Sequence, residues 1–458
     1  MHLRLRFAAG LMAAVAVLAA PAARAFCGFY VGKADTSLFN EASQVVLVRD
    51  GERTVVTMSN DYKGPLTEFA LGVPVPVVLQ REQIHVGERK HIERLDAYSA
   101  PRLVEYFDEN PCQPRVAYKS LAPSASAGAP LPESAPRRRS HGVKVEAEYA
   151  IGEYDILILS AEQSDGLELW LRENGYRIPE KASQALRPYI QQDMKFFVAK
   201  VNLKRQKATG FNYLRPLQMA YESEKFMLPI RLGMANARGP QDLVIYAMTR
   251  SGRVESSNYR TVKVPSNMDL PVFVKGEFAK VYPALFERAN QEEGRRALFT
   301  EYVWDMGWCD PCAADPLSPE ELRALGVFWL DEQPQGQGRR SRRPALGGGA
   351  SPVVLTRMHV RYDGEHFPED LVFQVTNDRQ NFQARYVLRH AWKGEAKCEA
   401  GKQYLAALEE RHRTEAQKLA ELTGWELDTI HRKMGDDAPG KGKGKVKKDD
   451  AWYKKLWK

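Results

Sequence analysis

Two cysteines, Cys309 and Cys312, lie in the segment whose residue types point most directly to a chemistry. Residues 304–312 read Trp-Asp-Met-Gly-Trp-Cys-Asp-Pro-Cys, and a Trp-Cys-x-Pro-Cys pattern is typical of thiol–disulfide oxidoreductases. In those enzymes the first cysteine lies at a helix N-terminus, where the backbone N–H groups and the helix dipole stabilise its thiolate. Here the next predicted helix begins only near Ser318, and the sequence has no obvious parallel βαβ pattern. We therefore interpret the pair as a structural disulfide, with a redox centre as the alternative.

A zinc site is a further alternative for the same pair. Cys309 and Cys312 could supply two of the four ligands that zinc requires, and Cys398 with His359 or His366 could complete the set. The sequence contains no second pair of ligands at the spacing of a zinc knuckle. We therefore predict no metal site and no cofactor.

Motifs of the common hydrolases and nucleotide-binding enzymes are missing from the sequence. It contains no Gly-x-Ser-x-Gly, no His-Glu-x-x-His and no Gly-x-x-x-x-Gly-Lys-Ser/Thr motif. Asp305 and Asp310 flank the first cysteine of the pair, and we interpret them as turn residues that hydrogen-bond their own backbone. His412 is interpreted as a histidine at the edge of a core. We assign no catalytic residue, and the interpretation leans towards a protein that is not an enzyme.

The first 25 residues have the three parts of a cleavable secretory signal. Arg4 and Arg6 give a positive start, residues 8–20 form an apolar run, and small residues precede Phe26. We predict cleavage after Ala25 and a secreted or periplasmic mature chain. No later run reaches the ~18 apolar residues that a membrane span needs, so no transmembrane segment is predicted after signal removal.

An oxidising compartment favours disulfides, and the chain has five cysteines. Cys27 and Cys112 flank one continuous structured segment, and we predict that they form the long-range bond. Closing a loop of roughly 86 residues would stabilise the fold by about 4 to 5 kcal/mol in the chain-entropy model. Cys309 and Cys312 form the second predicted pair, which leaves Cys398 unassigned.

The formal net charge of +8 is distributed very unevenly. Basic residues are concentrated in residues 119–142 and 334–351, which we predict to be disordered insertions, and in the lysine-rich tail at 435–458, also predicted to be disordered. The rest of the chain is net acidic, which argues against nucleic-acid binding because a folded site would gather basic and aromatic residues on one face. The lysines of the tail could make weak contact with an anionic envelope surface.

The region at 26–434, apart from the two insertions, has the apolar patterns of an α+β fold with mostly antiparallel sheet, interspersed helices and a long C-terminal helix. Asp50-Gly51 predicts a hairpin turn, and Ser318, Pro319 and Glu321 predict a capped helix start. The predicted strands are 44–49, 53–58, 68–76, 143–150, 154–159, 195–203, 217–221, 243–249, 254–264, 298–304, 353–362, 371–376 and 383–392. The predicted helices are 84–106 with a break at Pro101, 166–173, 182–192, 278–292, 320–325 and 402–422. The prolines of 68–76 predict an edge position or a strand end.

Several short motifs together resemble a known family. They are Cys27-Gly28, Val73-Pro74-Val75-Pro76, Tyr154-Asp155-Ile156, Gly166-Leu167, Trp170-Leu171, Asn174-Gly175-Tyr176, Ile178-Pro179, Asn258-Tyr259-Arg260 and Cys309-Asp310-Pro311-Cys312. In combination they resemble the bacterial domain-of-unknown-function family 2330, over most of residues 26–434. The resemblance implies an extracytoplasmic bacterial protein and supplies no activity, cofactor or catalytic residue. Some members end in a membrane anchor, whereas this chain ends in the lysine-rich tail.

These observations predict a secreted or periplasmic protein with a binding or structural role in the cell envelope. Its partner in the envelope is not identified by the sequence. The alternative is a periplasmic thiol–disulfide oxidoreductase that uses Cys309 and Cys312.

Overall fold

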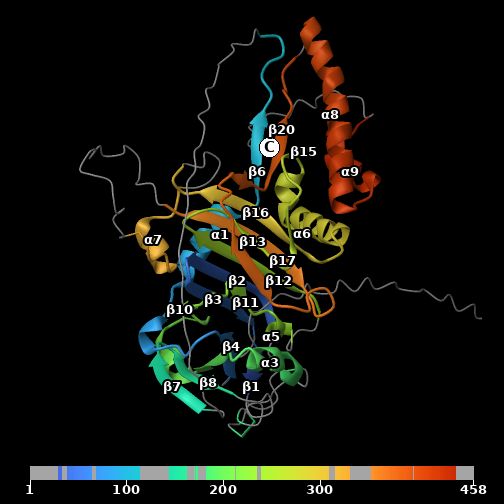
Figure 1. Ribbon diagram of the computed structural model, residues 1–458. Helices are drawn as coiled ribbons and strands as arrows, with labels where there is room; N and C mark the ends of the chain where they lie inside the picture. Colours follow the sequence, from blue (N-terminus) through green and yellow to red (C-terminus); the bar gives the residue numbers. More distant parts are fainter. Residues whose placement is uncertain are drawn as a thin grey trace, which may run out of the picture.

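The computed structural model of the chain contains two large β-sheets, of which the larger lies in the middle of the molecule and the smaller at its lower end in Figure 1. The structure describes residues 29–32, 39–63, 69–113, 144–161, 170, 172–173, 182–211, 213–234, 239–308, 315–330, 352–395 and 397–439. The predicted signal, both predicted insertions and residues 440–458 of the predicted tail lie outside this part of the chain.

The larger sheet has nine strands and is mostly antiparallel. Eight of them follow the order β14 (Arg260–Lys263), β16 (Ala297–Asp305), β17 (Val354–Tyr362), β12 (Gln241–Thr249), β2 (Phe39–Asp50), β3 (Arg53–Lys63), β10 (Leu217–Glu222) and β5 (Ile84–Val86). The ninth, β19 (Phe382–Gln383), pairs with β16. Within the sheet, β12 runs parallel to β2, and β14 runs parallel to β16.

The second sheet has five strands and packs against the first. Its order is β1 (Phe29–Gly32), β4 (Phe69–Val75), β9 (Lys195–Val201), β8 (Tyr154–Ser160) and β7 (Lys144–Ile151). Side chains alternate between the two faces of a strand. In β2, Val45 and Leu47 therefore join the core between the sheets, while Val46 and Val48 join a core on the opposite face. This is why residues 45–48 are continuously apolar.

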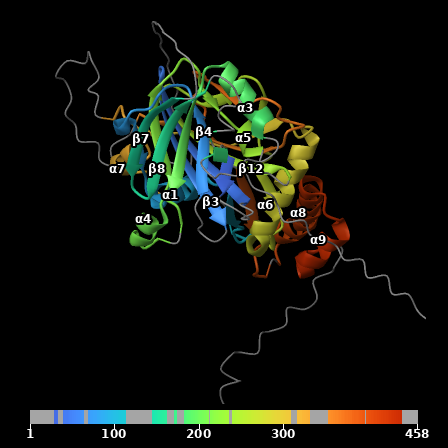
Figure 2. The same cartoon turned by 90° about the horizontal axis from the view of Figure 1, so that it is seen from below.

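Helices cover the outer faces of both sheets (Figures 1 and 2). On the larger sheet, α1 (Arg89–Ser99) and α7 (Pro319–Ala324) pack over the second core. On the five-stranded sheet, α3 (Ala182–Gln191) and the short α5 (Arg231–Met234) close a further cluster. A six-residue helix, α4 (Leu203–Ala208), follows β9. Two short 3-10 helices are also present: η1 (Arg81–Gln83) and η2 (Gly435–Asp437).

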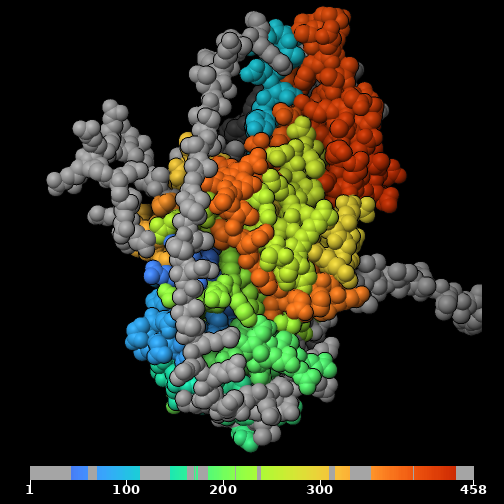
Figure 3. Space-filling view, in the orientation of Figure 1, coloured from blue at the N-terminus to red at the C-terminus, as the bar shows by residue number. Residues whose placement is uncertain are grey.

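A separate layer lies at one end of the molecule, and we call it the C-terminal layer because it contains the last two α-helices of the described chain. Strand β20 (Arg385–His390) lies between β15 (Met268–Leu270) and β6 (Arg102–Phe107), and all three run parallel. Helices α6 (Val274–Glu292), α8 (Glu399–Thr423) and α9 (Leu427–Met434) share one hydrophobic core with this sheet. Figure 3 shows α8 and α9 along one side of that end. A fourth, small sheet has the order β11 (Met227–Leu228), β18 (Leu371–Val375) and β13 (Val254–Ser256).

Local signals placed most of the elements correctly, and the α+β class is confirmed. Gly51 has a positive φ in the β2–β3 turn, as the hairpin signal requires. Ser318 accepts a hydrogen bond from Glu321 N, and the Glu321 carboxylate accepts one from Ser318 N, which is the predicted capping box. Gly424 ends α8 in the left-handed conformation.

Two expectations about the N-terminal half need correction. The segment 84–106 is not helical in two parts: α1 covers Arg89–Ser99, and residues 102–107 form β6 because they pair with β20. Strand β4 is not at an edge, since it lies between β1 and β9. Pro74 is the next-to-last residue of β4 and Pro76 follows its last residue, Val75, which agrees with the strand-end alternative.

In the part of the chain that the structure describes, no helix is long and apolar enough to cross a membrane. The predicted helix at 166–173 is described only at residues 170 and 172–173, which are helical. Residues 435–439 were assigned to the tail by the prediction, yet Ala438 is buried against the core of the C-terminal layer.

Candidate functional site

A buried cluster of charged side chains joins β12, β16 and β17 beneath α6. His359 of β17 lies between two carboxylates: its Nδ1 is 3.0 Å from Glu301 Oε1, and its Nε2 is 3.4 Å from Asp242 Oδ1. Glu301 is 1% exposed. Arg357 Nε donates to Glu301 Oε2 at 2.6 Å, and Arg361 donates to both oxygens of Asp242 at 2.7 Å. The three strands are neighbours in the sheet, which is what brings these side chains together.

The partners in this cluster hold each group in its charged form. Burial favours the neutral form of the Glu301 carboxyl, but Arg357 and His359 outweigh burial and lower its pKa to about 2. Burial likewise disfavours the imidazolium, but the hydrogen bonds with Asp242 and Glu301 raise the pKa of His359 to about 9. The pKa of Asp242 is lowered, because His359 and Arg361 more than offset its burial.

This cluster is suited to stability rather than to catalysis. Both ring nitrogens of His359 are engaged by carboxylates, and the Phe286 ring of α6 stacks on the imidazole with centroids 3.7 Å apart. A general base needs a free nitrogen within hydrogen-bond reach of a substrate. Perturbed pKa values also arise in structural ion-pair networks. We therefore assign the cluster to the joining of α6 to the sheet.

A pocket of about 570 Å³ lies on another part of the molecule, where the β2–β3 turn, the β10–β11 loop, α5 and β18 meet. Its volume falls in the range of small-molecule sites. The residues that line it are Arg49, Gly51, Gln192, Glu224, Lys225, Phe226, Met227, Arg231, Asn258, Glu369, Asp370, Val372, Phe373, Gln374 and Val375.

Arg49 is the buried cation of this pocket, with 7% of its surface exposed. Its Nη1 donates to Thr54 Oγ1 at 2.6 Å, to Ser223 O at 2.8 Å and to Glu52 O at 3.0 Å. These acceptors are neutral, and within the described ranges no carboxylate lies at ion-pair distance from Arg49. Burial lowers the pKa of the guanidinium. Among the described residues, only neutral groups therefore contact the charge of Arg49, which leaves it available to an anion.

Asp370 organises the opposite wall and is only 3% exposed. Its Oδ1 accepts hydrogen bonds from Tyr189 OH at 2.6 Å and from Ile230 N at 2.9 Å. Its Oδ2 accepts from Arg231 Nη2 at 2.9 Å. Burial, together with the charge of Asp370, raises the pKa of the Tyr189 hydroxyl. Because Asp370 and Arg231 satisfy each other, they form a structural support for the pocket.

The motif residue Asn258 fixes the strand that carries this wall. Its Nδ2 donates to Asp370 O at 2.8 Å, and its Oδ1 accepts from Val372 N at 3.0 Å. The next residue, Tyr259, exchanges hydrogen bonds with the backbone of Glu369. Asn258-Tyr259-Arg260 is one of the motifs that carry the family resemblance, and the sequence alone assigned it no role. The sequence analysis named neither Arg49 nor Asp370 as a site residue. The sequence signal for each was a charged residue at one end of an apolar strand.

Lys225 adds an exposed cation at the pocket. Its Nζ donates to Gln192 Oε1 at 2.9 Å, and it makes no ion pair with a carboxylate elsewhere in the described ranges. Phe226, Val372 and Phe373 contribute apolar surface to the walls. Arg231, by contrast, is neutralised by Asp370 and Glu369. The geometry therefore suits a ligand that carries an anionic group on an apolar body.

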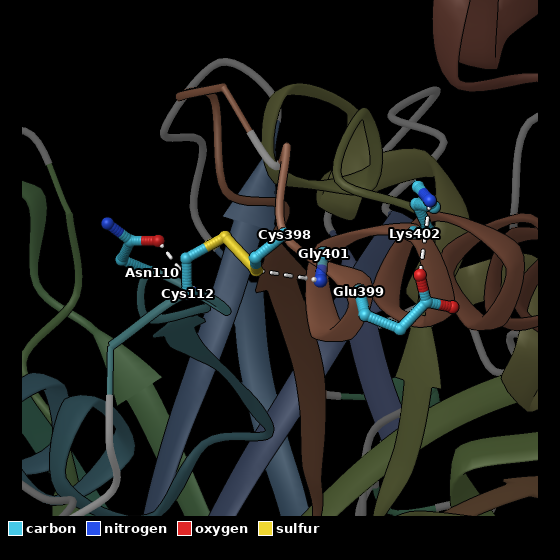
Figure 4. Close-up of a disulfide and its surroundings, with 6 residues drawn as sticks. All are labelled: Asn110, Cys112, Cys398, Glu399, Gly401 and Lys402. Carbon is cyan, nitrogen blue, oxygen red and sulfur yellow. Dashed lines mark hydrogen bonds and ion pairs between the residues drawn. A yellow bond between two sulfur atoms is a disulfide. The ribbon is translucent and has the colours of Figure 1, made fainter.

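The structure pairs Cys112 with Cys398, so the predicted Cys27–Cys112 bond is wrong in its partner (Figure 4). The two Cα atoms are 5.9 Å apart. Cys112 follows β6 and Cys398 follows β20, and these parallel neighbours end side by side at Phe107 and His390. A bond across 286 residues stabilises the fold by about 5 to 6 kcal/mol in the chain-entropy model. Cys27, Cys309 and Cys312 lie outside the described residues.

The other residues singled out by sequence are dispersed. Cys398 cannot complete a zinc site with Cys309 and Cys312, because its sulfur is bonded to Cys112. His366 lies beside Asp363, with 2.8 Å between Nδ1 and Oδ1. Among the described residues, no group of histidine, cysteine, aspartate and glutamate side chains is suited to hold a metal ion.

Two further residues behave as predicted. Asp305 Oδ1 accepts a hydrogen bond from Gly307 N at 3.0 Å, which confirms it as a turn residue. His412 lies 8% exposed on α8, at the edge of the core of the C-terminal layer. Asp310 lies outside the described residues.

No curated protein and no solved structure shows a significant match to this chain. A family comparison does match, over residues 21–374, and this range includes all the residues that line the Arg49 pocket except Val375. The match ends before β20, α8 and α9. On this basis the chain belongs to DUF2330, a family described as uncharacterised protein conserved in bacteria.

Proposed function

We propose that this chain is an exported protein of the bacterial cell envelope, and that it binds a small anionic molecule in the Arg49 pocket. Residues 1–25 have the composition of a secretory signal. The Cys112–Cys398 bond is compatible with an oxidising compartment outside the cytoplasm. Mass measurement of the mature protein tests the export step: we expect a chain that begins at Phe26.

One observation carries the binding proposal. Arg49 is a buried cation at the wall of a pocket, and within the described ranges it has no carboxylate partner. Taking a charge out of water is costly unless it is paired or hydrogen-bonded, and an anion that enters the pocket gains an interaction that no protein carboxylate already occupies. The same argument distinguishes Arg49 from Arg231, whose charge is already neutralised.

The apolar walls suggest which anion to test. Phe226 and Phe373 pack with centroids 5.3 Å apart and border the same pocket as Arg49. The Arg49 guanidinium lies 5.3 Å from the centre of the Phe226 ring. A carboxylate with a short alkyl chain would place its charge near Arg49 and its chain against these rings. We therefore use acetate, hexanoate and hexanoate methyl ester as probes.

Isothermal titration of the mature protein tests this proposal. We expect hexanoate to bind more tightly than acetate, because it buries more apolar surface. The methyl ester should not bind, because it lacks the charge. Replacing Lys225 with Met should weaken hexanoate binding roughly ten- to a hundredfold, since a hydrogen bond to a charged group is worth about 1.5–3 kcal/mol. Arg49→Lys should also weaken it, because lysine cannot reproduce the fixed fork of the guanidinium.

The matched control is Arg53→Met. Arg53 is an exposed arginine next to the same hairpin turn, paired with Glu222 and absent from the pocket lining. It should leave binding unchanged. If hexanoate and its ester bind equally, or if Arg53→Met and Lys225→Met have the same effect, the proposed anion site is wrong.

A further inference from the structure

We propose that the Cys112–Cys398 disulfide is an exchange site for an external dithiol, which attacks Cys112 and releases Cys398 as the leaving thiolate. Cys112 is exposed, and it lies in the turn that follows β6 (Figure 4). Cys398 is only partly exposed, and it is the N-cap residue of α8. The two sulfurs of one bond therefore have different surroundings, and this difference sets the direction of exchange.

The surroundings of Cys398 favour it as the leaving group. Gly401 N donates a hydrogen bond to Cys398 Sγ at 3.2 Å, at the start of a 25-residue helix. The N-terminus of a helix carries a partial positive charge and stabilises an adjacent anion, a cysteine thiolate included. Glu399 in the first turn opposes this effect, but its carboxylate pairs with Lys402 Nζ at 3.1 Å.

Among the described residues, no N–H group donates a hydrogen bond to the sulfur of Cys112. Cys112 follows a strand, and its own N–H donates to Asn110 Oδ1 at 3.0 Å, which fixes the turn but places no donor on the sulfur. A disulfide exchanges fastest when the sulfur under attack is accessible and the departing sulfur is the more stable thiolate. Both conditions select attack at Cys112.

The exchange is a two-electron transfer in two steps. First, a thiolate of the dithiol bonds to Cys112 Sγ, the bond between Cys112 and Cys398 breaks, and Cys398 departs as a thiolate. The second thiol of the dithiol, once deprotonated, then attacks the first sulfur of the dithiol, which is bonded to Cys112 in the mixed disulfide. This step releases Cys112 as a thiolate. The dithiol becomes a cyclic disulfide, the protein holds two reduced cysteines, and the protons of the dithiol pass to solvent or to these thiolates.

Reduction of the Cys112–Cys398 bond separates the turn after β6 from the start of α8 only locally, because other contacts still hold α8 in place. Asp108, just after β6, accepts hydrogen bonds from Tyr404 OH at 2.6 Å and from Arg411 Nη2 at 2.7 Å. From Leu408 onwards the helix buries side chains in the protein interior. The turn between Cys398 and Tyr404 makes few such contacts, so exchange frees the start of α8 and the turn at Cys112 while the body of the protein stays folded.

The direction of attack can be read with a monothiol, which stops at the first step. The folded full-length chain is incubated with reduced glutathione, free thiols are trapped with N-ethylmaleimide, and the peptides are analysed by mass spectrometry. We expect glutathione on Cys112 and N-ethylmaleimide on Cys398. Glutathione mainly on Cys398, no exchange without denaturant, or free thiols at both positions before treatment would each overturn the proposal.

A pair of charge variants tests the role of the helix. Glu399→Lys places a positive charge beside Cys398, and Glu409→Lys makes the same change at an exposed position of the same helix. We expect Glu399→Lys to accelerate reduction by dithiothreitol roughly two- to fivefold at low salt, as a charge at a helix terminus would. Glu409→Lys should change the rate much less. Equal rates in the two variants would refute stabilisation of the thiolate by the helix.

Discussion

Replacement of Glu415 by Gln should stabilise this protein at neutral pH, which is unusual for a buried position. Glu415 lies on α8 and is 2% exposed. The nearest cation is Arg411, whose Nε is 3.6 Å from Oε1, too far for a hydrogen bond. Burial, reinforced by Asp269 and Asp437, outweighs the attraction of Arg411 and raises the pKa of Glu415 to about 8.

The sign and size of the effect follow from proton linkage. The ordinary pKa of this carboxyl is 4.5, so between pH 4.5 and 8 the folded chain keeps a proton that the unfolded chain has lost. The contribution of Glu415 to the free energy of unfolding is therefore fully present below pH 4.5 and is lost as the pH rises through 8. By pH 7 the loss amounts to about 3 kcal/mol, at 1.36 kcal/mol for each pH unit. Glutamine carries no charge at any pH and suffers no such loss.

Urea unfolding of the wild type and Glu415→Gln at pH 4.5 and pH 7 measures this difference. The free energy of unfolding of the variant, relative to the wild type, should be higher at pH 7 than at pH 4.5 by about 3 kcal/mol. Arg411 keeps its ion pair with Asp108 in the variant, so no unpaired cation is created. Glu409→Gln, an exposed change on the same helix, should show no such dependence. An equal effect of Glu415→Gln at both pH values would refute the reasoning.

Three other predictions concern the rest of the molecule. The pKa of His359 is raised from 6.5 to about 9 in the fold. This shift contributes about 3 kcal/mol to the free energy of unfolding, which is present below pH 6.5 and is lost as the pH rises through 9. In urea unfolding, His359→Gln should therefore destabilise the protein strongly at pH 6 and much less at pH 10. A chain that ends at Val375 lacks β20, the central strand between β15 and β6, and should show no cooperative thermal unfolding by circular dichroism. The wild-type protein should not catalyse insulin reduction by dithiothreitol; turnover that disappears in Cys309→Ser would instead favour the oxidoreductase function.

The elements that the sequence predicted well are those fixed by neighbouring residues. The hairpin at Gly51, the capping box at Ser318 and the end of α8 at Gly424 each depend on residues within about four positions of one another, so a short stretch of sequence contains the whole signal. Strand periodicity is local in the same way. It placed most strands of both large sheets to within about five residues, but β1 was not predicted and β5 lies in a segment that was predicted to be helical.

Predictions failed where the deciding partner lies far along the chain. Residues 102–107 can be helix or strand by local preference, and they become β6 because β20, some 280 residues later, supplies the hydrogen bonds. The same parallel pairing brings Cys112 to Cys398. Loop-closure entropy could not identify that partner, because it changes only slowly with loop length.

The sequence by itself therefore determined most of the strands and helices, the α+β class and the family, because periodicity, caps and short motifs are properties of adjacent residues. Only the tertiary structure decided which charges meet. Arg49 became a buried cation with no carboxylate partner among the described residues, and His359 became an imidazolium between two carboxylates, through strand pairings and loops that join distant parts of the chain. An ionisable side chain acquires its chemistry from its burial and its neighbours. Both are set by the fold, so no local pattern could have identified the partners of either residue.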